Sequence, residues 1–296
     1  MATRRHIVLA GLSFLLMPAP VQAQAKLRVV ATFSILGDLT KQVGGDRVEV
    51  TTLARPDGDA HVFSPSPADA RTVSAAKLVV TNGLGLEGWM TRLVKASGAK
   101  VPIVVASKGI ASRQMAEDGK METDPHAWQS VANAKVYVGN IRDGLIAADP
   151  ASKDAYSGNA TAYLAKLDAL ETEVKAAIAA IPADRRKIIT SHDAFGYFSA
   201  AYGLQFVAPE GVSTDTEPTA RDVARIIAQI RKDKIPAVFL ENISDPRLMQ
   251  QIARETGARI RGKLYSDALS KPDGPAATYV DMMRHNIRQL GVALTN

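Results

Sequence analysis

Short apolar segments alternate with amphipathic patterns from residue 27 to the end of the chain. Apolar runs of about four to eight residues, bounded by polar or turn residues, are typical of buried strands. Such runs occupy residues 27–32, 48–53, 78–81 and 102–106 in the first half, and residues 188–191, 204–208, 237–240 and 259–265 in the second. The regular alternation of strands with helical patterns predicts an α/β fold built on mainly parallel sheets that helices cover.

Two helical patterns stand out between these strands. A helix with one buried face is indicated by apolar residues at i, i+3, i+4 and i+7, namely Val223, Ile226, Ile227 and Ile230. A longer pattern covers residues 153–181, and its apolar stripe consists of Tyr156, Ala160, Tyr163, Leu164, Leu167, Leu170, Val174 and Ile178. A helix of that length would extend about 40 Å and act as a stiff connector.

The long helical pattern separates two groups of strands, so we predict two α/β lobes joined by one rigid helix. The N-terminal lobe would cover residues 24–149, the linking helix residues 150–182 and the C-terminal lobe residues 183–296. A single stiff helix between the lobes argues against large hinge closure. Residues 107–123 are polar and mildly acidic, and we predict an exposed loop there.

The first residues have the pattern of an export signal. Arg4 and Arg5 precede a mostly apolar stretch over residues 7–17, and small residues near Ala23 suit a signal peptidase. We therefore predict a signal peptide over residues 1–23 and a periplasmic protein, with Sec and twin-arginine export both open. The sequence contains no cysteine, so we expect no lipid anchor, no disulfide and no thiolate metal ligand.

The charge pattern argues against a nucleic-acid partner. The formal net charge is +6, basic and acidic residues are interspersed, and the longest basic run is only residues 185–187. A nucleic-acid-binding face would instead gather its basic residues in a stripe or patch.

Three histidines and one aspartate lie where the predicted strands lead into loops. His61 comes after the second strand, His192 directly follows the strand at 188–191, and Asp267 follows the last strand. Ligands of open α/β sheets bind outside the carboxyl ends of the strands, so these side chains can meet there. His126 lies on a loop of the first half that can reach the same crevice. We predict a site at the seam between the lobes.

This set of side chains favours zinc. Three imidazoles and one carboxylate suit tetrahedral Zn²⁺, whereas manganese prefers more oxygen ligands, and copper and nickel are not excluded. Asp124 lies two residues before His126, and Asp193 directly follows His192. We expect these two aspartates to orient the imidazole rings, and the alternative role for both is to cap a helix. His285 lies in an amphipathic C-terminal pattern, where a structural role is expected, and His6 lies in the predicted signal peptide.

Several segments resemble the ABC-importer solute-binding proteins specific for zinc and manganese (cluster A-I), with ZnuA- and AztC-like zinc members and a PsaA-like fold. The similarity spans essentially the whole mature chain. Its segments are Val30-Ala31-Thr32-Phe33-Ser34-Ile35, Asp59-Ala60-His61-Val62-Phe63-Ser64-Pro65-Ser66-Pro67, Asp124-Pro125-His126-Ala127-Trp128, Ser191-His192-Asp193-Ala194-Phe195-Gly196-Tyr197-Phe198, Phe239-Leu240-Glu241-Asn242 and Leu264-Tyr265-Ser266-Asp267-Ala268-Leu269.

The resemblance implies two pseudo-symmetric lobes and a metal site at His61, His126, His192 and Asp267. It places histidine at the third ligand position, where manganese members usually carry glutamate. It thus implies a monomeric periplasmic protein that delivers one Zn²⁺ to an ABC-importer permease in the inner membrane. A periplasmic zinc chaperone as a further partner stays open. Many zinc members have a His-rich loop before the second ligand, whereas residues 107–123 contain no histidine.

Three alternatives remain from the sequence. A zinc-dependent hydrolase or lyase could use three histidines and a bound water, although no H-E-x-x-H motif is present. A surface adhesin would need an anchor that the sequence does not offer. A manganese-binding member of the same family would share the fold and most of the site.

Overall fold

The computed structural model describes residues 25–117, 120–215, 218–235 and 237–295. The predicted signal peptide over residues 1–23 lies outside the described residues. No helix among those that are described is long and apolar enough to cross a membrane.

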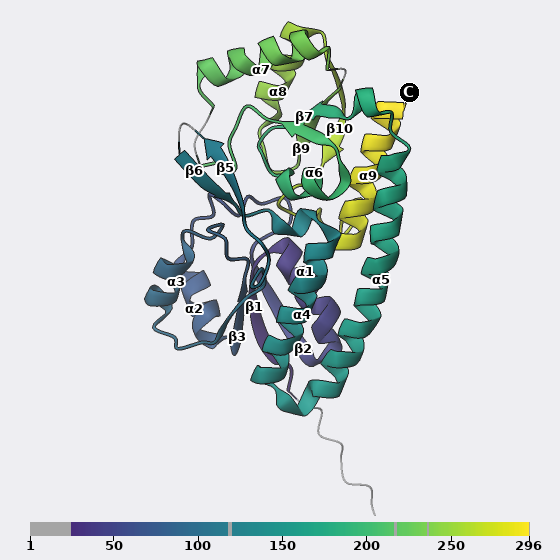
Figure 1. Cartoon of the computed structure of the whole chain (residues 1–296). Coiled ribbons are helices and arrows are strands. Elements are labelled where there is room, and N and C mark those ends of the chain that lie inside the picture. Colours follow the sequence, from purple (N-terminus) through teal and green to yellow (C-terminus); the bar gives the residue numbers. More distant parts are fainter. Residues whose placement is uncertain (1–24, 118–119, 216–217, 236, 296) are drawn as a thin grey trace, which may run out of the picture.

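Two parallel four-stranded sheets form the framework (Figure 1). The first has the order β2-β1-β3-β4, and its strands are β1 (Leu27–Phe33), β2 (Val48–Ala54), β3 (Leu78–Thr81) and β4 (Ile103–Val105). The second has the order β10-β9-β7-β8, and its strands are β7 (Lys187–Ile189), β8 (Gln205–Val207), β9 (Ala237–Glu241) and β10 (Arg259–Leu264). The predicted α/β class and all eight predicted strands are confirmed, with ends shifted by no more than a few residues.

Helices cover both sheets. The first lobe carries α1 (Ser34–Gly44), α2 (Pro67–Ala75), α3 (Met90–Ser97) and α4 (Val131–Ala148), and the second carries α6 (Gly196–Tyr202), α7 (Ala220–Asp233), α8 (Pro246–Thr256) and α9 (Tyr279–Thr295). Short 3₁₀ helices are η1 (Gly45–Arg47), η2 (Ala127–Gln129), η3 (Pro150–Ser152) and η4 (Ala183–Arg185). Capping boxes at Ser66 and Thr219 begin α2 and α7, because each side chain accepts a backbone N–H that the first helical turn leaves free.

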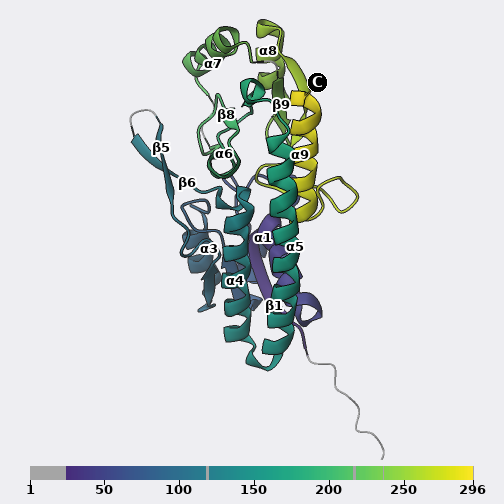
Figure 2. The same ribbon diagram turned by 45° about the vertical axis from the view of Figure 1, so that its right-hand side comes forward.

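The long helix α5 (Lys153–Ala179) runs along both lobes (Figures 1 and 2). Its predicted apolar stripe is buried, except that Leu164 is only partly covered. The helix packs on α1 and α4 at one end and on α9 at the other. Glu173 of α5 forms a two-pronged ion pair with Arg284 of α9, with both N–O distances 2.7 Å. The prediction of a rigid helical bridge is therefore confirmed.

The predicted exposed loop at 107–123 is wrong for most of its length. The structure has an antiparallel hairpin there, formed by β5 (Arg113–Glu117) and β6 (Lys120–Asp124). The segments are polar on both faces, so they lack the alternation of apolar and polar residues that identifies a half-buried strand. The hairpin projects from the side of the molecule (Figure 2).

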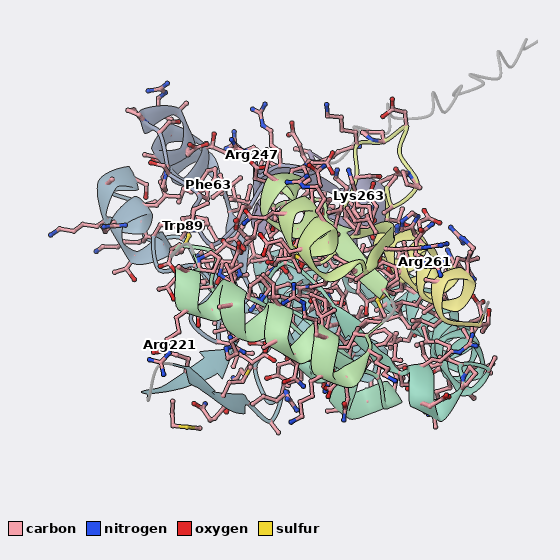
Figure 3. All side chains as sticks on the ribbon, turned by 90° about the horizontal axis from the view of Figure 1, so that it is seen from above. Phe63, Trp89, Arg221, Arg247, Arg261 and Lys263 are labelled. Atoms are coloured by element: carbon pink, nitrogen blue, oxygen red, sulfur yellow. The ribbon has the colours of Figure 1, made fainter. Side chains whose placement is uncertain are left out.

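One continuous core extends from the first lobe along α4, α5 and α9 into the second. Trp128 is fully buried in it and ties the lobes together: its Nε1 donates to Ser266 O at 2.9 Å, and its carbonyl accepts from Tyr279 Oη at 2.7 Å. A smaller cluster under α2 and α3 includes Phe63 and Trp89, which lie side by side in Figure 3 with ring centroids 4.8 Å apart.

Four basic residues of the second lobe come from three different elements, α7, α8 and β10. Figure 3 shows Arg221, Arg247, Arg261 and Lys263 at separate places around the lobe.

Candidate metal centre

His61, His126, His192 and Asp267 converge, and one potential ligand atom from each lies within 4.8 Å of the others. The oxygen Oδ2 of Asp267 lies 3.2, 3.5 and 3.1 Å from the Nε2 atoms of His61, His126 and His192 respectively. The Nε2 atoms of His61 and His126 are 3.2 Å apart. A tetrahedron with metal–ligand bonds of about 2.0–2.2 Å has edges of about 3.3–3.6 Å, close to these separations.

The parallel sheets bring these side chains together because the carboxyl ends of their strands face the seam between the lobes (Figure 1). His192 comes three residues after the end of β7, and Asp267 comes three residues after the end of β10. His126 lies between the end of β6 and η2. His61 lies on the segment after β2, where its backbone N–H donates to Asp59 Oδ1 at 2.8 Å.

Three of the four side chains are inaccessible to solvent. His126, His192 and Asp267 are 0% exposed, and the His61 side chain is 4% exposed. A hollow of about 560 Å³ adjoins the cluster, and among the four side chains only His61 lines it. The other walls come from the segment at 84–88 and from residues near Glu122 and Ser213. The cluster is therefore reached from the side of His61.

In two of the histidines, a carboxylate lies next to Nδ1, the ring nitrogen on the side away from Asp267. Asp124 Oδ1 lies 2.9 Å from Nδ1 of His126 and also accepts the backbone N–H of His126. Glu241 Oε2 lies 2.8 Å from Nδ1 of His192, as an ion-pair contact whose angle is not that of a hydrogen bond. Such contacts hold the rings with Nε2 turned inward and make the nitrogens better metal ligands.

Of the two aspartates expected to orient imidazole rings, Asp124 lies at the ring of His126, while Glu241 and not Asp193 lies at Nδ1 of His192. The carboxylate at the ring of His192 belongs to Glu241, which ends β9, the neighbour of β7 in the sheet. Its position at a strand end, inside one of the segments that carry the family resemblance, was the signal available in the sequence. Asp193 is largely buried beside Asp124, and burial followed by repulsion from Asp124 raises its pKa to about 6.

Opposite charges dominate the cluster. Burial alone would lower the pKa of His126, but Asp267 and Asp124 outweigh it and raise that pKa to about 9. Burial likewise opposes a charge on His192, yet Glu241 and Asp267 hold its pKa well above the usual value. Burial would raise the pKa of Asp267, but His126 and His192 hold it well below the usual range. The cluster thus attracts positive charge, and a divalent cation would have to displace protons.

His285 lies outside this cluster. Its Nε2 is 2.9 Å from Lys263 O, and its ring packs edge-on against Tyr265. Both contacts join α9 to the end of β10, in keeping with the structural role expected from the sequence.

The sequence of this chain is similar to a known protein family and to characterised metal-binding proteins. Residues 29–293 match the model of a family described as "Zinc-uptake complex component A periplasmic". The manganese-binding lipoprotein MntA of Halalkalibacterium halodurans is 36% identical over 261 residues, which is 88% of this chain and 86% of MntA. The iron-binding protein YfeA of Yersinia pestis is 34% identical over 269 residues, which is 90% of this chain and 86% of YfeA.

A solved structure agrees as well. The periplasmic zinc binding protein TroA from Treponema pallidum superposes with a TM-score of 0.87 at 30% identity, covering 92% of this chain and 100% of that one. The three similar proteins are therefore named for three different metals.

Proposed function

Since this chain belongs to the family of the periplasmic zinc-uptake component A, whose members are metal-binding solute-binding proteins of ABC transporters, we propose that it binds one Zn²⁺ ion and delivers it to an importer permease in the inner membrane. Members of this family are not enzymes, so the alternative of a zinc hydrolase or lyase is set aside. The choice of zinc, and the four ligands, are our proposal.

The observation that carries the proposal is the nitrogen-rich donor set. Three imidazole Nε2 atoms surround Asp267 Oδ2 at 3.1 to 3.5 Å, which is the spacing of a closed tetrahedral shell. Manganese and magnesium favour shells with more oxygen ligands and higher coordination number. A site of three nitrogens and one oxygen therefore favours zinc.

Manganese is the second candidate, and one feature of the site favours it. The other carboxylate oxygen of Asp267, Oδ1, is buried and has no hydrogen-bond partner among the described residues. If both oxygens bound the ion, the shell would have five ligands, which suits manganese better than a four-ligand shell does. MntA, a relative of this chain, is named for manganese.

Release of the ion would require the seam between the lobes to open. Asp59 accepts a hydrogen bond from Thr214 Oγ1 at 2.5 Å, and the backbone N–H of Asp57 donates to Leu269 O at 2.9 Å. These bonds hold the segment that carries His61 against the second lobe. Because α5 is a stiff bridge, we propose that the permease separates these contacts locally, without a large rotation of the lobes.

Periplasmic solute-binding is the family's role, and we further propose that the mature protein is a monomer released freely into the periplasm. Several relatives are called lipoproteins, whereas the printed sequence contains no cysteine to carry a lipid. Cell fractionation tests this point: we expect the protein in the periplasmic fraction, and recovery with the membranes after a salt wash would refute free release.

Metal competition tests the proposed function. The purified protein is stripped of metal, offered equal concentrations of Zn²⁺, Mn²⁺ and Fe²⁺, desalted, and analysed for bound metals. We expect one zinc per chain and little manganese or iron. One manganese per chain under these conditions would replace zinc by manganese in the proposal, and no bound metal would refute it.

A further inference from the structure

Beside the metal centre, the β5–β6 hairpin of the first lobe rests on α6 of the second. Arg113 begins β5 and Asp124 ends β6, and the two residues face each other directly in the antiparallel register. Gly196 and Tyr197 are the first residues of α6. Figure 1 shows the hairpin reaching upward from the first lobe alongside the second.

Arg113 and Asp124 form an ion pair inside this contact. Arg113 Nε lies 3.5 Å from Asp124 Oδ2, and the Asp124 side chain is 0% exposed. Both atoms are buried, and neither has a hydrogen-bond partner within the described residues. A buried carboxylate oxygen without a compensating charge is costly, so the guanidinium stabilises Asp124 where it stands.

The same carboxylate holds a proposed metal ligand. While Oδ2 faces Arg113, Oδ1 accepts the backbone N–H of His126 at 2.9 Å and lies 2.9 Å from its Nδ1. The two oxygens of Asp124 thus link the guanidinium to the imidazole. Any displacement of Arg113 changes the position or the charge balance of the group that orients His126.

The hairpin is held on α6 by Tyr197. Tyr197 Oη accepts the backbone N–H of Arg113 at 3.0 Å and donates to Ala111 O at 3.4 Å. The guanidinium carbon of Arg113 lies 5.6 Å from the centre of the Tyr197 ring, within reach of a cation–π interaction. The packing is close: a Cβ atom on Gly196 would approach Asp124 Oδ2 to 2.4 Å.

We propose that Arg113 is a positioning residue for the metal centre, acting on His126 through Asp124, and that the seating of the β5–β6 hairpin on α6 sets the rate at which the metal leaves. The inference rests on the proposed metal site. Lifting the hairpin from Tyr197 moves Arg113 and Asp124, the paired end residues of the two strands, away from α6. The carboxylate that orients His126 then shifts, and the ring of His126 is held less firmly. A partner that contacts the hairpin can therefore speed release without touching a ligand.

Zinc dissociation from the full protein, measured by stopped flow with excess chelator as the trap, tests this inference. Arg113→Gln retains a long polar side chain but removes the charge, and we expect it to release zinc about tenfold faster, at the lower end of the range for lost partners of metal ligands. Arg113→Lys restores the charge and should recover most of the difference. Gln114→Ala is the matched control, because Gln114 is exposed on the same hairpin and, among the described residues, its side chain hydrogen-bonds across the hairpin to Thr123.

A double-mutant cycle tests the route through the carboxylate. In an Asp124→Asn background, Arg113→Gln should have almost no further effect on the release rate. The visible spectrum of Co²⁺ at the site should change in Arg113→Gln and stay unchanged in Gln114→Ala, which a general loss of stability would not produce. The inference would be overturned if Arg113→Gln released zinc at the wild-type rate. It would also be overturned if Arg113→Gln accelerated release as much in the Asp124→Asn background as in the wild type. A wild-type protein that binds no zinc would instead refute the proposed function.

Discussion

Replacing Glu241 by glutamine should weaken zinc binding by about 10- to 100-fold, although Glu241 is not expected to touch the ion. Its Oε1 accepts the backbone N–H groups of Ser191 and His192 at 2.8 and 3.0 Å, and its Oε2 lies 2.8 Å from Nδ1 of His192. When Nε2 of His192 binds the metal, Nδ1 carries the proton and needs an acceptor.

The glutamine variant separates these roles. Its side-chain oxygen can still accept the two backbone N–H groups, so the segment that carries His192 should stay in place. Its NH₂ group then faces the Nδ1–H of the ring, where two donors oppose each other and the negative charge is gone. A 10- to 100-fold loss corresponds to about 1.4 to 2.8 kcal/mol of binding free energy.

Competition with a fluorescent zinc chelator at neutral pH measures this difference. Glu255→Gln is the matched control, since Glu255 is an exposed glutamate on α8 of the same lobe and its carboxylate contacts Gln251. The control should bind zinc like the wild type. If Glu241→Gln also bound zinc with wild-type affinity, the carboxylate would not support the ligand, and the reasoning about the ring would be refuted.

The other predictions concern the ligands, protons and packing of the same centre. His192→Ala should abolish tight zinc binding in a calorimetric titration while the exposed Lys166→Ala leaves it intact; tight binding by both variants would remove His192 from the site. Zinc affinity should rise with pH through the neutral range, because the pKa of His126 in the metal-free protein is about 9 and the ion must displace that proton. Calorimetry in buffers of different ionisation enthalpy should count at least one proton released per zinc at neutral pH, and a count of zero would contradict this. Gly196→Ala should lower the melting temperature and weaken zinc binding, since the new Cβ would approach a carboxylate oxygen to 2.4 Å. As a control, a Cβ at Gly139 in α4 meets nothing within 4 Å, so Gly139→Ala should stabilise the fold by about 0.4–1 kcal/mol. Equal melting temperatures of the two variants would argue against the close packing at Gly196.

The framework of the fold was predictable because its strands are buried and its helices are amphipathic. Strands such as β1 and β3 are nearly continuous apolar runs, and the stripe on α5 repeats with the period of a helix. Parallel sheets also bring their strand ends to one edge, which is why His192 and Asp267 could be paired before any coordinates.

The features that the sequence did not reveal depend on which strands lie side by side. Glu241 is 49 positions from His192 along the chain and becomes its neighbour only because β9 lies next to β7. The sequence pointed instead to the adjacent Asp193, because nothing local to residues 190–193 indicates which carboxylate faces the ring. The pairing of Arg113 with Asp124 likewise requires the register of a hairpin that has no apolar alternation.

X-ray absorption at the zinc edge of the loaded protein tests the central claim most directly, because it reports the atoms bound to the ion. We predict four ligands at about 2.0–2.2 Å, with multiple scattering from three imidazoles and one oxygen from a carboxylate. A shell with fewer than three imidazoles, or six oxygen-rich ligands, would contradict the assignment of His61, His126, His192 and Asp267 as the zinc site.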